Sequence, residues 1–384
     1  MTHPGSDGRR LYYLVATAGC PNYGDELIAA GWLRQLARTD PEADVWVDTQ
    51  APGPAAVLLG GEHPRVRFTD TLWRLCWEAP SDEPWRVSAW VQDAVHHPGL
   101  APRWIHGIEL LRRADVVHVI GGGYVSGVWP RHTGLLAGVV AAARLSGART
   151  AMTGQGLCPV ADGAAELLRA LAARFDVVDV RDEPTAELLG VPASVDDAFL
   201  VIGPELYSDH LGDDRDVPEV MVCLQSDLAE VGTQRVASAT LAMLRRWQVP
   251  PDRVCFAECI PRVDREVYTL LEPELPGARF LPFVDVWRSG LPVSPLQTWI
   301  STRFHPHLVA AAGGAPGVAM SVRPDFYDTK HRSLIEQGSG WTLLDVTDGT
   351  VPERPGTGGF DEGALEKFQR AKLRLAEEIY APRD

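Results

Sequence analysis

The sequence of 384 residues lacks a long hydrophobic run. A membrane-spanning helix needs roughly 18 consecutive apolar residues, whereas the longest apolar stretch, 135–145, is shorter and contains glycine and arginine. The N-terminal residues MTHPGSDGRR also lack the apolar core of a secretion signal. We therefore expect no integral membrane segment and a cytoplasmic protein.

Positive charge is scarce as well. The chain has 36 Lys and Arg against 51 Asp and Glu, a net charge of −15. Proteins that bind nucleic acid usually carry a basic face, so the composition argues against a nucleic-acid partner. Because the field of the whole chain repels anions, a site for an anionic substrate must be made locally by a few basic side chains.

CxxC motifs are also missing. The six cysteines are scattered, show no CxxC pair and lie mostly in apolar surroundings. We therefore expect buried reduced thiols rather than disulfides. Their spacing does not fit a zinc site, and no metal ligands are predicted.

Strand-like and helix-like segments alternate along the whole chain. Apolar runs such as 11–16, 116–120 and 220–224 predict buried strands, and segments with helical apolar spacing follow them. Such alternation is typical of α/β folds in which helices flank parallel sheets. Ligands in these sheets lie outside the carboxyl ends of the strands.

An acidic stretch without periodicity at 208–218 predicts a linker between two domains. We expect two Rossmann-like domains, 1–212 and 213–384, facing each other across a cleft. The second ends in a charged amphipathic helix at 363–380.

Residues 70–106 depart from the alternation and are rich in tryptophan and histidine. The simpler interpretation is an irregular insertion in the N-terminal domain that uses Trp to fill its core. The alternative is a surface on which Trp rings stack against sugars.

Three turns follow predicted strands. The N-Y-G-D-E turn at 22–26 suits a tight turn and a helix start, while Asp25 or Glu26 could also accept a proton from a substrate hydroxyl. The glycine run at 121–123 and the G-Q-G turn at 154–156 let backbone amides approach an anion or sugar. Tight strand-to-helix turns explain both equally well.

Residues 303–332 locally reverse the negative charge of the chain. Arg303 and His305 alternate at strand spacing and would point to one side of a strand. Arginine offers a planar fork for carboxylate or phosphate. Lys330 falls at a predicted helix start, where free amides attract anions. The pattern predicts an anion site, with a solvated basic surface as the alternative. The basic and histidine side chains are Arg303, His305, His307, Arg323, Lys330, His331 and Arg332.

The order of these motifs resembles the polysaccharide pyruvyltransferase family. Its N-x-G-D-E turn, glycine run and G-Q-G-x-x-P turn are matched at 22–26, 121–123 and 154–159, and its R-D and D-x-A-F elements at 181–188 and 196–199. The S-x-R-x-H signature matches Ser301, Arg303 and His305. The closing Y-D-x-K matches Tyr327, Asp328 and Lys330.

The resemblance implies a fold similar to GT-B glycosyltransferases and a transferase that uses phosphoenolpyruvate as co-substrate, with no other cofactor. It would form a cyclic pyruvate ketal on two hydroxyls of a sugar acceptor. His305 would act as general acid, Arg303 would hold the donor and stabilise departing charge, and Asp25 or Glu26 would be the base. The implied substrate-binding residues are Asn22, Gly122, Gly123, Gln155, Gly156, Gln225, Ser301, Arg323, Tyr327 and Lys330.

The chain departs from the family at the end of the first strand of the second domain. Relatives often have an arginine there, and this chain has Gln225. Two other interpretations stay open: a nucleotide-sugar glycosyltransferase of the same architecture, and a non-catalytic protein that binds a sugar or an anion. The sequence does not indicate the acceptor or the oligomeric state.

Overall fold

In the computed structural model the described residues are 8–203, 206–207 and 217–382. They form two compact units, each built on one six-stranded parallel sheet. The first unit comprises Met1–Cys20, Asp25–Leu200 and Arg370–Asp384, and the second comprises Pro21–Gly24 and Val201–Gln369. Most of the predicted linker at 208–218, including the predicted domain boundary, lies outside the described residues.

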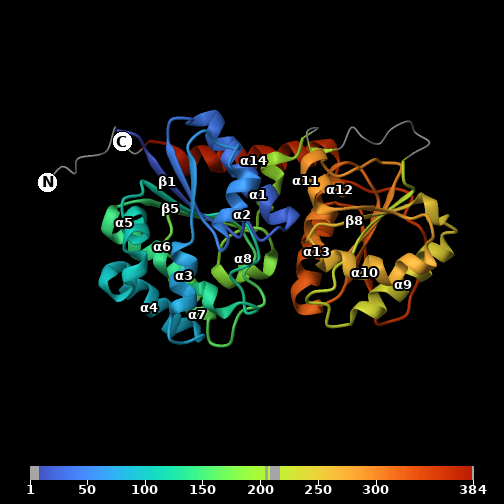
Figure 1. The fold of residues 1–384 in the computed structure, drawn as a ribbon, viewed down its shortest axis with the longest axis horizontal. Helices are drawn as coiled ribbons and strands as arrows, with labels where there is room; N and C mark the ends of the chain where they lie inside the picture. Colours follow the sequence, from blue (N-terminus) through green and yellow to red (C-terminus); the bar gives the residue numbers. More distant parts are fainter. Residues whose placement is uncertain (1–7, 204–205, 208–216, 383–384) are drawn as a thin grey trace. The chain divides into compact units, whose positions relative to one another are not determined.

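The first sheet has the strand order β3-β2-β1-β4-β5-β6 (Figure 1). This is the order of a Rossmann fold, in which the chain direction across the sheet reverses between the first and fourth strands. The strands are β1 (Leu11–Val15), β2 (Asp44–Asp48), β3 (Val66–Thr69), β4 (Val116–Val119), β5 (Arg149–Gln155) and β6 (Val177–Val180). β1 and β4 pair directly, so the reversal point lies between them.

The second sheet repeats this topology with the order β12-β11-β10-β7-β8-β9. Its strands are β7 (Val220–Cys223), β8 (Val254–Ala257), β9 (Arg279–Leu281), β10 (Thr298–Ser301), β11 (Gly317–Ser321) and β12 (Thr342–Asp345). β7 is the first strand of this unit and β10 the fourth, and they pair directly. The reversal point of the second sheet therefore lies between β7 and β10.

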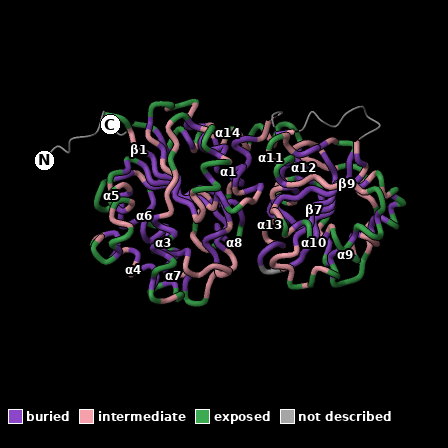
Figure 2. The backbone as a smooth tube through the Cα atoms, viewed as in Figure 1, coloured by how far each residue is buried: buried purple, intermediate pink, exposed green. Residues whose placement is uncertain are grey.

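Helices cover both sheets, and the central strands are buried (Figure 2). This explains the continuous apolar runs of the strands, because a parallel sheet covered on both faces has no polar side. The helices before the linker are α1 (Tyr23–Thr39), α2 (Pro52–Leu59), α3 (Thr71–Glu78), α4 (Pro84–His96), α5 (Ile105–Leu111), α6 (Thr133–Ser146), α7 (Ala165–Ala172) and α8 (Glu183–Leu189). Those after it are α9 (Thr233–Arg246), α10 (Val263–Leu271), α11 (Phe283–Ser289), α12 (Phe304–Ala312), α13 (Thr329–Glu336) and α14 (Glu362–Tyr380). Within the described residues, no helix combines the length and apolarity needed to cross a bilayer.

The prediction of an irregular insertion at 70–106 is wrong. The region consists mainly of α3 and α4, which pack against α6. Trp73 is fully buried in the core of the first unit, whereas Trp77 and Trp85 are exposed. The prediction of a core role for the tryptophans is thus correct for Trp73.

A buried ion pair organises the interior of the first unit. The Asp197 carboxylate accepts hydrogen bonds from the Trp32 indole (2.8 Å), the Gly121 amide (2.8 Å) and the Thr153 hydroxyl (2.6 Å). Its other oxygen lies 2.9 Å from Nζ of Lys372, a fully buried side chain on α14. Burial lowers the pKa of Lys372, but the carboxylates outweigh it and the net shift is upward. Asp197 therefore connects the ends of β4 and β5 to α1 and α14.

We predict that Lys372→Ala destabilises the first unit by about 3–5 kcal/mol, because it leaves Asp197 buried without its cation. Denaturant unfolding would measure this loss. Lys367→Ala, an exposed lysine of the same helix, is the matched control and should change the free energy of unfolding by less than about 0.5 kcal/mol. Equal effects of the two variants would contradict the role of the buried pair.

Candidate functional site

The reversal point of the second sheet brings two segments together. Cys223, the last residue of β7, pairs in register with Ser301, the last residue of β10. Gln225 and Arg303 follow these two strand ends. The Gln225 amide donates to Oγ1 of Thr302 at 2.8 Å, which joins the two segments. In Rossmann folds ligands bind at this point.

Arg303 precedes the first turn of α12, and Ser301 fixes its backbone. The Ser301 hydroxyl accepts from the Arg303 amide (3.0 Å) and donates to its carbonyl (2.9 Å). The prediction that Arg303 and His305 share one face of a strand is wrong, because β10 ends at Ser301 and His305 lies in α12.

Two carboxylates hold the Arg303 guanidinium. Nε and Nη2 donate to Oδ1 of Asp264 at 3.0 and 2.5 Å, and Nη2 also donates to Oδ1 of Asp227 at 2.9 Å. Burial lowers the pKa of Arg303, but the two carboxylates outweigh it and raise the pKa overall. Among the described residues, Nη1 makes no hydrogen bond, so its two N–H groups are left for a ligand.

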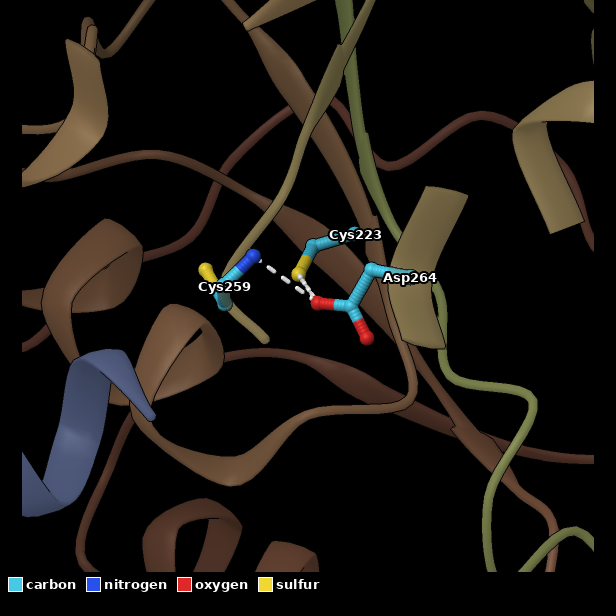
Figure 3. A group of neighbouring side chains, drawn as sticks. All are labelled: Cys223, Cys259 and Asp264. Carbon is cyan, nitrogen blue, oxygen red and sulfur yellow. Dashed lines mark hydrogen bonds between the residues drawn. The ribbon is translucent and has the colours of Figure 1, made fainter. Parts of the chain in front are cut away.

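Asp264 is anchored on its other side by the backbone. Its Oδ2 accepts from the amides of Cys259 (2.8 Å) and Ile260 (2.9 Å), and the thiol of Cys223 lies 3.9 Å away (Figure 3). Burial raises the pKa of the Asp264 carboxyl, while Arg303 and these amides lower it, and the net shift is upward. These bonds fix the Asp264 carboxylate, which in turn holds the Arg303 guanidinium in place.

Cys223, Cys259 and Asp264 place three potential metal-ligand atoms within 4.8 Å of one another (Figure 3). Their chemistry does not suit a cation. Asp264 is already paired with the guanidinium of Arg303, and burial raises the pKa of the Cys223 thiol well above its ordinary value. Metal binding needs the thiolate, so this group acts as the support of Arg303.

Tyr327 interacts electrostatically with Arg303, and Lys330 lies near Tyr327. Tyr327 is in a π-helical turn, η9 (Pro324–Asp328), that follows β11. Burial raises the pKa of the Tyr327 hydroxyl, and the nearby Arg303 partly offsets the rise. Nζ of Lys330 lies 3.3 Å from the ring centroid of Phe326 and 5.2 Å from that of Tyr327. The structure thus brings Arg303, Tyr327 and Lys330 together, while Arg323 pairs with Glu230 at 3.1 Å.

His305 contacts the start of the first helix. Residues Pro21–Gly24 belong to the second unit, where the Tyr23 amide donates to the carbonyl of Cys259 at 2.9 Å. A Cβ atom on Gly24 would overlap the imidazole of His305. The Asn22 side chain accepts from the Gly24 amide at 3.2 Å and so shapes this turn. Glycine at position 24 is therefore required by the close approach of His305.

His307 and His331 add no positive charge, contrary to the count of basic side chains in the sequence. Both are buried, and their Nδ1 atoms lie 3.0 Å apart. Burial lowers the pKa of His331 to about 4 and that of His307 well below its ordinary value. Nε2 of His307 lies 2.9 Å from the Ser339 hydroxyl, and Nε2 of His331 lies 3.3 Å from the Thr302 carbonyl. The two neutral rings thus form a buried chain of polar contacts from Ser339 to the backbone of Thr302, the residue before Arg303.

In the first unit, the two glycine turns are bonded to each other. The Gly122 amide donates to the carbonyl of Gly154 (3.3 Å), and the Gly156 amide donates to the carbonyl of Gly122 (2.9 Å). Gln155 is fully buried and its amide nitrogen donates to the Ile120 carbonyl at 2.7 Å. These turns lie at the carboxyl ends of β4 and β5, with Gly123 half-buried.

The two carboxylates of the N-Y-G-D-E turn differ in their surroundings. Glu26 is fully buried, and its Oε1 accepts from the Gly19 amide at 2.7 Å. Asp25 is half-buried. Glu26 therefore fixes the loop between β1 and α1, and Asp25 is the more accessible carboxylate.

A sequence model of the polysaccharide pyruvyl transferase family matches residues 22–236, more than half of the chain. The chain belongs to the polysaccharide pyruvyl transferase family. The match includes the N-Y-G-D-E turn, both glycine turns and Asp197, and it ends before Arg303. No curated protein matches the sequence.

The fold of this pyruvyl transferase family member is similar to solved structures over 97% of its length. One is UDP-GlcNAc 2-epimerase from Neisseria meningitidis bound to UDP-GlcNAc, with TM-score 0.52, 10% identity and 94% of that chain covered. Others are S. aureus MnaA with UDP (0.52, 11% and 89%) and TcCGT1 in complex with UDP (0.51, 12% and 94%). At such identities the likeness shows the fold alone. The expected α/β fold of two Rossmann-like domains, similar to the GT-B glycosyltransferase fold, is confirmed.

Sequence reasoning missed Asp227 and Asp264. A signal for Asp264 existed, because it shares the buried face of α10 with Val267 and Leu271. A carboxylate on an apolar helix face needs a buried partner. Asp227, in a polar turn after β7, carries no comparable signal.

We predict that the free energy of unfolding falls as the pH drops from about 6.5 to about 4, because the unfolded chain protonates His307 and His331 before the folded chain does. Urea unfolding across this pH range would measure the slope. The His307→Asn/His331→Gln double variant should show a shallower slope. An unchanged slope would mean that the pair is not held neutral.

Proposed function

We propose that this chain is a pyruvyltransferase that moves pyruvate from phosphoenolpyruvate onto two hydroxyls of a sugar acceptor and releases phosphate. The observation that carries the proposal is Arg303 at the reversal point of the second sheet, in a member of the pyruvyl transferase family. A cytoplasmic role in polysaccharide biosynthesis would fit this activity.

The reaction needs a proton donor for C3, groups that stabilise the departing phosphate, and a base for the acceptor hydroxyls. C3 of the donor must gain a proton so that C2 becomes electrophilic, and the two acceptor hydroxyls add to C2. The C2–O bond to phosphate breaks, and phosphate leaves with that electron pair. Of the two hydroxyl protons lost, one balances the proton gained at C3 and the other leaves with phosphate or solvent. The product is a cyclic ketal.

His305 is the proposed general acid, a role worth about 10²–10⁴-fold in rate. Nη1 and Nη2 of Arg303, together with Nζ of Lys330, would hold the carboxylate and phosphate of the donor and stabilise the departing charge. Further donor contacts would come from Arg323 and Tyr327. The buried Ser301 and Gln225 would act indirectly, because their side chains bond to the backbone of Arg303 and of Asp227. Cationic side chains can balance the donor, so the proposed mechanism does not require a metal ion.

The acceptor would bind at the turns that follow the strands of the first unit. Asp25 is the better candidate for the base, because Glu26 is buried and bonded to the Gly19 amide. Gly123 and the Asn22 side chain would offer polar groups to sugar hydroxyls, while Gly122 and Gly156 would hold the two turns together, because their amides donate to the carbonyls of Gly154 and Gly122. Gln155 would orient these turns, since its amide nitrogen donates to the end of β4.

A nucleotide-sugar glycosyltransferase is the second candidate, because similar folds are solved with UDP or UDP-GlcNAc. Thermal-shift measurements with phosphoenolpyruvate, UDP and GDP separate the two. Stabilisation by phosphoenolpyruvate alone supports the pyruvyltransferase. Stabilisation by a nucleoside diphosphate alone supports the glycosyltransferase.

We predict that Arg303→Ala and His305→Ala each reduce phosphate release from phosphoenolpyruvate at least about 100-fold. The assay uses galactoside, glucoside and N-acetylmannosamine acceptors. Arg332→Ala is the control, because this arginine of α13 is 63% exposed and, among the described residues, pairs with Asp328 at 3.8 Å. If both site variants keep the activity of the control on a working acceptor, the assignment is wrong.

We also predict that Gly24→Ala lowers the turnover number at least about tenfold, since the new methyl group must displace the proposed general acid His305. Gly53→Ala is the matched control: Gly53 also lies in the first turn of a helix, but a Cβ there meets no atom within 4 Å. Steady-state assays of the two variants would compare them. Equal activities would show that the contact has no bearing on catalysis.

A further inference from the structure

The two carboxylates that hold Arg303 are anchored very differently. The Asp264 side chain is 1% exposed, and both of its oxygens are bonded, to Arg303 and to two backbone amides. The Asp227 side chain is 39% exposed. Among the described residues its carboxylate contacts only Nη2 of Arg303, at 2.9 Å. Asp264 is thus a fixed support, and Asp227 is a contact that can be exchanged.

The turn that carries Asp227 is suited to movement. The next residue, Leu228, has a φ of +51°, a conformation that side chains other than glycine adopt rarely. Such strain is typical of functional sites and persists only where surrounding contacts hold it. Here those contacts include the Arg303–Asp227 pair and the bond from the Gln225 side chain to the Asp227 carbonyl (2.7 Å). Losing the Arg303 contact would let the turn relax.

The local charge also needs explanation. At the strand ends of the reversal point, one guanidinium faces two carboxylates, and the neutral Gln225 follows β7. Phosphoenolpyruvate carries a carboxylate and a phosphate. It cannot approach Nη2 of Arg303 while the Asp227 carboxylate occupies it, since like charges repel at close range.

We propose that Asp227 is an internal placeholder for the donor: its carboxylate occupies Arg303 in the empty enzyme, and the carboxylate or phosphate of phosphoenolpyruvate displaces it. Asp264 keeps the guanidinium oriented throughout. Asp227 is therefore a residue that sets donor affinity, and Arg303 never stands in the site without a counter-charge. This inference rests on the proposed function, since it assigns the displacing anion to the donor.

The test compares donor binding by wild type and Asp227→Asn, measured by isothermal titration calorimetry with phosphoenolpyruvate and, separately, inorganic phosphate. Asn keeps the size of the side chain and removes the competing charge. We expect Asp227→Asn to bind phosphoenolpyruvate about tenfold more tightly. In steady-state assays KM for the donor should fall while kcat does not rise, a split that general destabilisation would not produce.

Glu266→Gln is the matched control. Glu266 lies on α10 two residues beyond Asp264 and is exposed. This variant removes the same charge from the same region, so it should change the affinity less than about threefold. Equal tightening by both variants would reduce the effect to overall charge and overturn the placeholder.

The remaining outcomes separate the two proposals. If wild type binds phosphoenolpyruvate and Asp227→Asn binds it equally or less tightly, the placeholder is wrong and the proposed function stands. If neither folded protein binds phosphoenolpyruvate at millimolar concentration, both are overturned. Circular dichroism spectra and unfolding midpoints establish that the variants are folded.

Discussion

The second half of this molecule depends on the ion pair between Arg303 and Asp264. Removing one partner of such a buried pair costs about 3–5 kcal/mol, because the other charge is left in a poorly solvating interior. Asp264 also accepts hydrogen bonds from the backbone amides that follow β8, and Arg303 follows β10. The thiol of Cys223, at the end of β7, lies 3.9 Å from Asp264. The pair therefore connects the ends of β7, β8 and β10 to α10. A guanidinium held in this way loses little further entropy when it meets an anion.

The first unit uses the same physical solution at the corresponding place. Asp197 accepts a hydrogen bond from the backbone amide of Gly121, just after β4. β4 is the fourth strand of the first unit, and β10 is the fourth strand of the second. Its counter-charge is Lys372. The group that the buried carboxylate holds differs, however: it is the Gly121 amide in the first unit and the Arg303 guanidinium in the second.

The sequence predicts most central strands and the helices that follow them, because continuous apolar runs identify buried parallel strands. It does not reveal β2, β3, β9 and β12. The last three are short edge strands that are partly exposed, and β2 begins and ends with aspartate. The sequence does not show the electrostatics around Arg303. Counting His307 and His331 as basic fails because burial keeps them neutral. The partners of Arg303 come from residues 227 and 264, far from it in sequence, so no local pattern could show that its charge is already balanced.

Helix α14 has a consequence for the order of folding. Its residues up to Gln369 belong to the second unit, and those from Arg370 belong to the first. During synthesis the ribosome must therefore translate the whole second Rossmann unit before Lys372 exists. Until then the carboxylates of Asp179 and Asp197 lack their Lys372 partner, and the first unit cannot complete the packing of its core. The nascent N-terminal unit stays incomplete for most of the translation time, and its maturation is coupled to the completion of the chain.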